Sequence, residues 1–218
     1  MRELAPSVQR RLEKWLKDQV QSRTYVRVPM RAPQSAGRPD GCGLYWTDYG
    51  EPRLIVIEAK TNRPELGIYQ AMRYKTFAHQ VYLFTQSDLV FYDYVRESAE
   101  HNGIGILFIG TRKRPGYPSL NYTKVTLIQS AEIGSPLEYP LYEEIVQINF
   151  NLVHCRICRS WCSMSEAFQQ ARPVQRLIRK RGKRLEWEDQ PRMIVCRICK
   201  DNLLKKVFRL QPLRYKQA

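Results

Sequence analysis

Apolar and polar positions follow two different periods in the first 110 residues of the chain. In residues 1–22 the apolar side chains recur every three or four positions, which predicts an amphipathic helix. Residues 64–80 are helical in character as well and open with a proline at the first turn. Short apolar runs predict strands at residues 25–30, 42–53, 54–60, 81–85 and 104–111. The run 54–60, LIVIEAK, is apolar on both faces, so we expect it in the centre of a sheet.

The order of these elements predicts an α/β fold with a mixed central sheet flanked by helices. Residues 89–103 mix strand and helix signals, and residues 111–150 predict loops with one or two strands, at 124–131 and 145–151. After Phe150 the character changes, because two similar segments, HCRICRSW and VCRICKDN, bracket a basic stretch. We therefore expect two domains, residues 1–150 and residues 151–218.

The positive charge of the chain is concentrated in its last third. The formal net charge is +15; residues 151–218 hold 17 Lys and Arg against 5 Asp and Glu, whereas residues 1–150 hold 19 and 16. Such asymmetry favours a polyanionic partner, and nucleic acid is the commonest one. A solubilising or ribosome-associated tail is the alternative interpretation.

The sequence predicts a protein of the cytoplasm or nucleoid that does not enter a membrane. No apolar run approaches the roughly 18 residues that a membrane span needs, and the first residues lack the apolar core of a secretory signal. In a reducing compartment the six cysteines are expected to be metal ligands or free thiols. No P-loop motif occurs, so the sequence does not predict a built-in ATP motor.

The apolar strand predicted at 54–60 ends with two charged residues. Glu58 and Lys60 are two positions apart and therefore share one face of the strand. Asp40 lies 18 positions before Glu58, which leaves room for a hairpin that returns it to the same place. Two neighbouring carboxylates repel unless a cation lies between them, and Mg²⁺ or Mn²⁺ takes such oxygen ligands. A lysine beside such an ion suits phosphodiester hydrolysis.

These residues resemble the motif of the PD-(D/E)XK nuclease superfamily. Pro39-Asp40 followed by IEAK at 57–60 matches its core, and Gln70 and Tyr74 resemble the Q-x-x-x-Y element of RecB-like members. The resemblance covers roughly residues 1–110 and implies a restriction-endonuclease-like fold. It also implies that Gln70 assists the metal site, that Tyr74 contacts DNA, and that a glutamate of the first helix reaches the site. Glu3 fits that position best, with Glu13 as the alternative.

Four cysteines form a doubled C-x₂-C pattern: Cys155, Cys158, Cys196 and Cys199. Two such knuckles can close a tetrahedral Zn²⁺ site, and the second one is expected to run into a helix. His154 and Cys162 are near enough for an exchange of ligands. An iron–sulfur cluster, as in CRISPR-associated RecB-like exonucleases, is the alternative, although the position of Cys42 departs from that pattern. Cys42 and Cys162 are expected to be ordinary thiols.

Together these features predict a metal-dependent nuclease acting on DNA, with a basic zinc domain that helps to bind the nucleic acid. The basic stretch between the knuckles is expected to hold the nucleic-acid backbone through Arg179, Lys180, Arg181, Lys183 and Arg184. Two alternatives stay open: an inactive nucleic-acid-binding protein on the same fold, and an RNA-processing nuclease. Many relatives act as dimers, so a homodimer is also considered.

Overall fold

The structure is a computed structural model of the whole chain, and it has two compact units. These are Met1–Phe150 and Asn151–Ala218. The residues that it describes are 6–19, 25–27, 30–33, 36–47, 51–110, 124–170 and 193–202. Within these ranges no helix combines the length and the apolar character that a membrane span requires.

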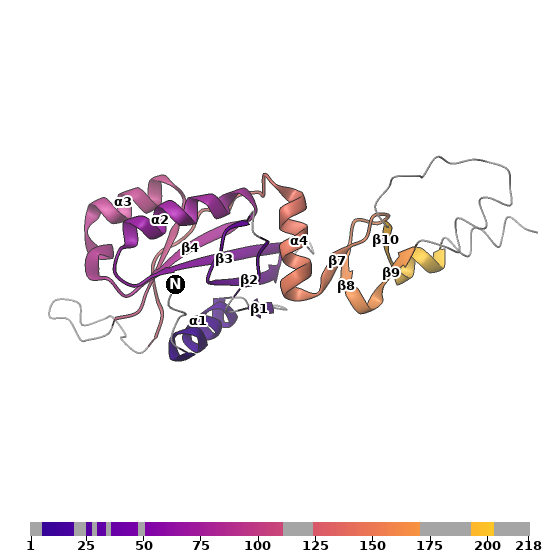
Figure 1. Cartoon of the computed structure of the whole chain (residues 1–218), viewed down its shortest axis with the longest axis horizontal. Helices are drawn as coiled ribbons and strands as arrows, with labels where there is room; N and C mark the ends of the chain where they lie inside the picture. Colours follow the sequence, from indigo (N-terminus) through magenta and orange to yellow (C-terminus); the bar gives the residue numbers. More distant parts are fainter. Residues whose placement is uncertain are drawn as a thin grey trace, which may run out of the picture. The chain divides into compact units, whose positions relative to one another are not determined.

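A six-stranded mixed sheet forms the centre of the first unit (Figure 1). In spatial order its strands are β1 (Tyr25–Arg27), β2 (Gly41–Trp46), β3 (Pro52–Lys60), β4 (Gln80–Thr85), β5 (Gly105–Phe108) and β6 (Thr126–Gln129). The β3–β4 and β4–β5 pairs are parallel and the others are antiparallel. The predicted α/β fold with a mixed sheet is therefore confirmed, and so is the central place of β3.

Helices cover both faces of this sheet (Figure 1). Helix α1 (Pro6–Gln19) lies on one face, and α2 (Pro64–Met72) and α3 (Asp93–His101) lie on the other. Two short 3₁₀ turns, η2 (Arg73–Thr76) and η3 (Asp88–Phe91), follow α2 and precede α3. The helix predicted over 64–80 is thus shorter than expected. It stops because the chain beyond it joins the sheet, where the backbone N–H of His79 donates to the carbonyl of Leu54 at 2.9 Å.

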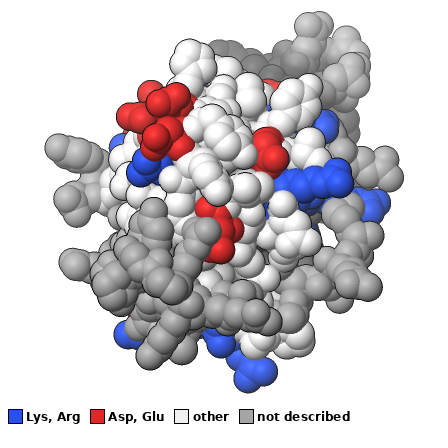
Figure 2. Space-filling view, turned by 90° about the vertical axis from the view of Figure 1, so that its left-hand side faces the viewer, with Lys and Arg blue, Asp and Glu red and all other residues white. Residues whose placement is uncertain are grey.

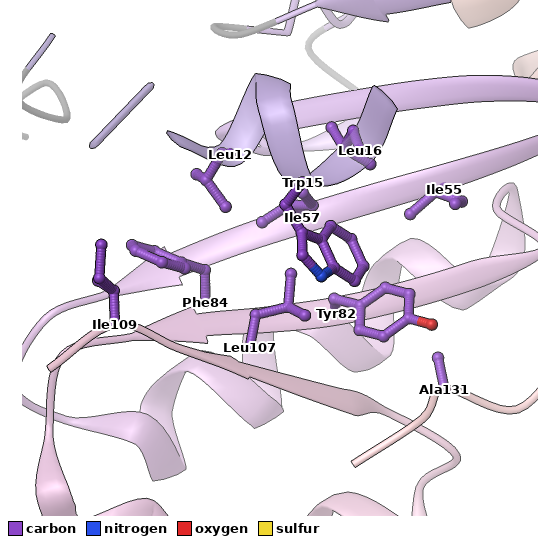
Figure 3. Close-up of a cluster of buried hydrophobic side chains, with 10 residues drawn as sticks. All are labelled: Leu12, Trp15, Leu16, Ile55, Ile57, Tyr82, Phe84, Leu107, Ile109 and Ala131. Carbon is purple, nitrogen blue, oxygen red and sulfur yellow. The ribbon is translucent and has the colours of Figure 1, made fainter. Parts of the chain in front are cut away.

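The hydrophobic core between α1 and the sheet is built from alternate residues of the central strands (Figure 3). Ile55 and Ile57 of β3 face Leu12 and Leu16 of α1, and all four side chains are almost fully buried. Trp15 packs its ring edge-to-face on Tyr82, with 5.3 Å between ring centroids. Since β-strand side chains alternate between faces, Glu58 and Lys60 point to the opposite side, toward α2.

The prediction of a strand at 145–151 is wrong. Residues Tyr139–Phe150 form helix α4, whose buried side chains recur at helical spacing: Tyr142, Ile145, Val146, Asn149 and Phe150. Packing of this face overrides the strand preference of its β-branched residues. Asn149 also fixes the segment before Asp40, since its side-chain amide accepts from the backbone N–H of Arg31 at 2.8 Å and donates to the Arg31 carbonyl at 2.7 Å.

The second unit contains two small antiparallel pairs. Strands β7 (Leu152–His154) and β8 (Trp161–Ser163) form a hairpin, and β9 (Ala167–Gln170) pairs with β10 (Met193–Cys196). A 3₁₀ turn, η4 (Met164–Glu166), joins β8 to β9. Residues 197–202 are helical, as predicted for the chain after the second cysteine knuckle.

The contact between Gly105 and Tyr82 gives a test of the packing. Gly105 lies opposite Tyr82 in the β4–β5 pair, and a Cβ at this position would lie 2.3 Å from the tyrosine ring and 2.7 Å from the backbone nitrogen of Ala131. We expect Gly105→Ala to lower the free energy of unfolding by about 1–3 kcal/mol. Gly134→Ala is the matched control, because its nearest neighbour would be 3.9 Å away. Urea unfolding followed by tryptophan fluorescence measures both, and equal stability of the two variants would contradict this packing.

Candidate active site and cysteine cluster

The hairpin of β2 and β3 brings Asp40 to the end of the central strand. The register pairs Gly41 with Ile57, and the backbone N–H of Asp40 donates to the Ile57 carbonyl at 2.9 Å. The Oδ2 atom of Asp40 accepts from the backbone N–H of Ala59 at 2.8 Å. The side chain of Asp40 is thereby fixed to the strand that carries Glu58 and Lys60, as the spacing in the sequence predicted.

Glu58 is a buried carboxylate with two protein donors. It is 3% exposed, Oε1 lies 3.2 Å from the Lys60 Nζ, and Oε2 accepts from the Tyr74 hydroxyl at 2.8 Å. Lys60 keeps 27% of its side chain exposed, so it is only partly buried. The ion pair between residues at i and i+2 follows from the side-chain alternation of a strand.

Tyr74, for which the resemblance implies a contact with DNA, is buried beside Glu58 and lines the cavity described below; the DNA contact stays a prediction. Its side chain is 5% exposed and contacts Glu58, so the ring is packed inside the protein. Gly37, with a φ of +78°, lies in the segment before Asp40 and allows that segment to approach the Tyr74 ring. A Cβ at this position would lie 3.3 Å from the Tyr74 Cε1. The hydrogen bond from the Tyr74 hydroxyl orients the Glu58 carboxylate.

Burial raises the pKa of both carboxylates. Desolvation is the main cause for Asp40, opposed by the Ala59 hydrogen bond and the charge of Lys60. For Glu58, desolvation raises the pKa, the Tyr74 hydrogen bond lowers it, and the charge of Asp40 raises it again. Desolvation and the negative charge of Glu58 raise the pKa of Tyr74, so its hydroxyl remains a donor. The negative charge of Asp40 therefore destabilises the charged form of Glu58, as expected for neighbouring carboxylates.

Gln70 adds an oxygen at the same place. Helix α2 lies close to the sheet at Gly67, where a Cβ would be 2.4 Å from Leu83 and 2.8 Å from the Lys60 side chain. One turn later, Gln70 lines a cavity of about 190 Å³ together with Gly37, Arg38, Glu58, Arg73 and Tyr74. Among the described residues, the buried Oε1 atom of Gln70 has no donor.

These features fit a divalent cation of the hard, oxygen-binding kind. Two carboxylates with raised pKa values and a buried amide oxygen without a donor are groups that Mg²⁺ or Mn²⁺ would satisfy. Asp40, Glu58 and Gln70 are the residues that would hold it. The described acidic residues contribute only a pair of carboxylates at this point, so water or substrate would supply the remaining ligands.

The sequence did not single out the two arginines that line the cavity, Arg38 and Arg73. Arg38 precedes the Pro39-Asp40 pair and Arg73 precedes Tyr74, so their position beside the motifs was the available signal. Glu3 lies outside the described residues. Glu13 lies on α1, whose buried face packs on the side of β3 opposite to Glu58.

The four cysteines of the second unit converge on one point. The sulfur atoms of Cys155, Cys158, Cys196 and Cys199 all lie within 4.8 Å of one another. The Cys158 and Cys196 sulfurs are 3.7 Å apart, and thiolates around a tetrahedral zinc ion with bonds of about 2.3 Å lie about 3.8 Å apart. The cluster is therefore compatible with a structural zinc site. An iron–sulfur cluster would separate the sulfurs further, because several irons and sulfides have to fit between them.

Local backbone hydrogen bonds position the cysteine side chains of this cluster. The backbone N–H of Cys196 donates to the Cys155 sulfur at 3.3 Å, and the turn between Cys155 and Cys158 closes with Arg159 at a φ of +63°. Hydrogen bonds from Ser160 lower the pKa of Cys158 to about 6, which favours the thiolate. Cys162, whose sulfur donates to the Val153 carbonyl, and His154, which contacts the Arg159 carbonyl, are not members of the cluster.

The basic residues predicted to hold nucleic acid lie outside the described residues: Arg179, Lys180, Arg181, Lys183 and Arg184. On the face of the molecule in Figure 2, acidic and basic side chains lie in small separate groups. Neither sign forms a continuous patch among the described residues visible there. The binding of nucleic acid by the second unit stays a prediction.

Comparison of the chain with protein-family models, with curated proteins and with solved structures gave no match.

The raised pKa of Asp40 gives a test of the site. A carboxylate whose folded-state pKa exceeds its unfolded value lowers stability as the pH rises between the two values. Asn in place of Asp40 removes this charge and can still accept from Ala59. We expect Asp40→Asn to raise the melting temperature at pH 7, and the difference from wild type to shrink toward about pH 4. Asp18→Asn, at an exposed position of α1, is the control. A pH-independent difference at Asp40 would contradict the assignment.

The cysteine cluster predicts one zinc ion per chain. Elemental analysis of purified protein should find zinc at about one equivalent, and Cys155→Ser should lose it together with the fold of the second unit. Cys162→Ser is the matched control, because a serine there can keep the hydrogen bond to Val153 and lies outside the cluster. Iron in place of zinc, or equal zinc loss in both variants, would contradict this arrangement.

Proposed function

We propose that this chain is a metal-dependent deoxyribonuclease with a restriction-endonuclease-like core and a zinc-binding module. One observation carries the proposal: Asp40, Glu58 and Lys60 meet at the end of the central strand, beside Gln70 and a cavity. The order of these residues along the chain is that of the PD-(D/E)XK motif. The strand, the helix after it and the hairpin before it support the same interpretation.

In this proposal each residue has a role that follows from its contacts. Asp40, Glu58 and Gln70 would hold Mg²⁺ or Mn²⁺. The bound ion would supply a more acidic water molecule and compensate the charge that develops on the phosphate. Lys60, partly exposed and 3.2 Å from Glu58, would orient water or donate to a phosphate oxygen. Tyr74 holds the Glu58 carboxylate in place by donating to Oε2.

The second unit would add affinity for nucleic acid. A zinc site stabilises a small domain that has few large apolar groups, and its net positive charge favours contacts with phosphates. Such contacts are independent of base sequence and weaken as salt concentration rises. A homodimer stays a prediction of the resemblance.

One observation favours a second candidate, a nucleic-acid-binding protein without catalytic activity. Both oxygens of Glu58 already have a protein donor, Lys60 for one and Tyr74 for the other. The charge of Glu58 is therefore compensated without a metal ion. A ribonuclease with the same site differs from the proposal only in its substrate.

Cleavage of a labelled substrate panel tests these possibilities. Single- and double-stranded DNA and RNA, labelled at either end, are incubated with the full chain, with and without Mg²⁺ or Mn²⁺. We expect metal-dependent cleavage of DNA that Lys60→Ala lowers about 100-fold or more, with DNA binding little changed. Lys75→Ala is the matched control, because Lys75 pairs with Glu132 at the same distance of 3.2 Å but away from the cavity.

The three outcomes separate the candidates. DNA binding with no cleavage under any metal condition would favour the binding protein, and cleavage restricted to RNA would favour the ribonuclease. DNA cleavage that persists in Lys60→Ala would overturn the role of this site.

A further inference from the structure

Two exposed arginines line the cavity together with Glu58. Arg38 and Arg73 both line it, one from the loop before Asp40 and the other from the end of α2. The ion pairs among the described residues involve other basic groups, namely Lys60, Lys75 and Arg96. Two guanidinium groups without a carboxylate partner in this part of the chain are suited to an anion, and phosphate is the group that arginine binds through paired hydrogen bonds.

The outer face of α2 continues from Arg73 as a stripe of exposed apolar and aromatic side chains. Leu66, Tyr69 and Arg73 are spaced at i, i+3 and i+7, so they lie along one side of the helix and the turn that follows. Leu66 is 52% exposed and Tyr69 is 70% exposed. Gln70 and Tyr74, one position further along, line the cavity instead. The ring of Tyr69 is thus within about one helical turn of Arg73.

The size of the cavity decides which part of a nucleic acid can enter it. Its volume is about 190 Å³, below the roughly 300 Å³ at which sites for small organic ligands begin. A phosphate group fits this space, whereas a whole nucleotide with its base does not. The bases of a nucleic acid bound there would then lie outside the cavity, and the exposed face of α2 that begins at Arg73 is one surface available to them.

An exposed tyrosine near a group that binds phosphate can bind the adjoining base by stacking. In a duplex each base is already stacked on its neighbours and paired, so a side chain stacks on bases that are unpaired. Stacking uses the face of the base, which all bases share, and so carries no sequence preference.

We propose that Tyr69 stacks on an unpaired base whose adjoining phosphate lies between Arg38 and Arg73, so that this site binds single-stranded DNA in preference to duplex DNA and without regard to sequence. The inference rests on the proposed function for the role of the cavity. It adds the class of substrate, and it assigns binding to a residue outside the nuclease motif.

Binding without cleavage tests the proposal. The full chain is titrated, without added divalent metal, into a labelled single strand of mixed sequence and into its duplex, and binding is followed by fluorescence anisotropy. We expect Tyr69→Ala to weaken single-strand binding about 5- to 100-fold, as for the loss of one stacked base. Tyr69→Phe keeps the aromatic face and should bind like wild type. Duplex binding should be the same in all three proteins.

A second measurement keeps the test sensitive if the basic second unit provides most of the affinity. A single strand containing 2-aminopurine changes its fluorescence when that base stacks on an aromatic ring. Wild type and Tyr69→Phe should give this change, and Tyr69→Ala should lose it. Arg38→Ala and Arg73→Ala should each reduce the salt dependence of binding by about one phosphate contact.

Matched controls lie far from the cavity. Tyr139→Ala removes an exposed tyrosine of α4, the helix whose Tyr142 hydroxyl donates to the carbonyl of Pro52 at the opposite end of β3. Arg10→Ala removes an exposed arginine of α1, on the other face of the sheet. Neither should change single-strand binding or the stacking signal.

The outcomes distinguish this inference from the proposed function. The inference would be overturned if Tyr69→Ala kept the single-strand affinity and the stacking signal of wild type. It would also be overturned if this variant lost affinity equally for single strand and duplex. In either case, metal-dependent cleavage would still support the nuclease. Conversely, a protein that binds single strands through Tyr69 but cleaves nothing would sustain the inference and overturn the nuclease.

Discussion

A buried carboxylate at the end of the central strand is the constraint on which the rest of the first unit depends. Glu58 is nearly inaccessible to water, and an isolated charge in such a place would be very costly. The fold compensates it from two directions, with Lys60 from the same strand and Tyr74 from the turn after α2. Gly67 and Gly37 allow these elements to come close enough. The site is therefore part of the packing and cannot be altered independently of it.

The two units are stabilised by different means. The first has a layered core in which α1 and the sheet bury large apolar side chains against each other. In the second, the buried cluster among the described residues consists of Val195 and three cysteines, with Cys162 packed against it. Bringing four cysteines together without an ion gives little stabilisation, because the thiolate forms that bind metal repel one another. A bound metal ion would hold the four cysteines together and so stabilise the fold of the second unit.

The sequence predicted the parts of the site that follow from local periodicity. Glu58 and Lys60 share a face because a strand has period two, and the chain length before Glu58 suited a hairpin that returns Asp40. The depth of Tyr74 was not predictable, since helical spacing gives the side of a helix but not how closely that side is packed. The second half of α4 was predicted as a strand over 145–151 because its isoleucines and valine favour strands, while tertiary packing decides their conformation. The arginines of the cavity belong to no motif and became apparent only in three dimensions.

The last turn of α4 links the border of the first unit to its site. The Asn149 side chain makes hydrogen bonds with both the backbone N–H and the carbonyl of Arg31, which lies 118 positions earlier. Arg31 belongs to the segment that leads to Asp40. A shortened protein that ends two residues before Phe150 would keep Asp40, Glu58, Lys60 and Gln70 and still lose the hydrogen bonds of Asn149. A defect in such a fragment could therefore not be assigned to the missing second unit alone, because the segment that leads to Asp40 would have lost these hydrogen bonds as well.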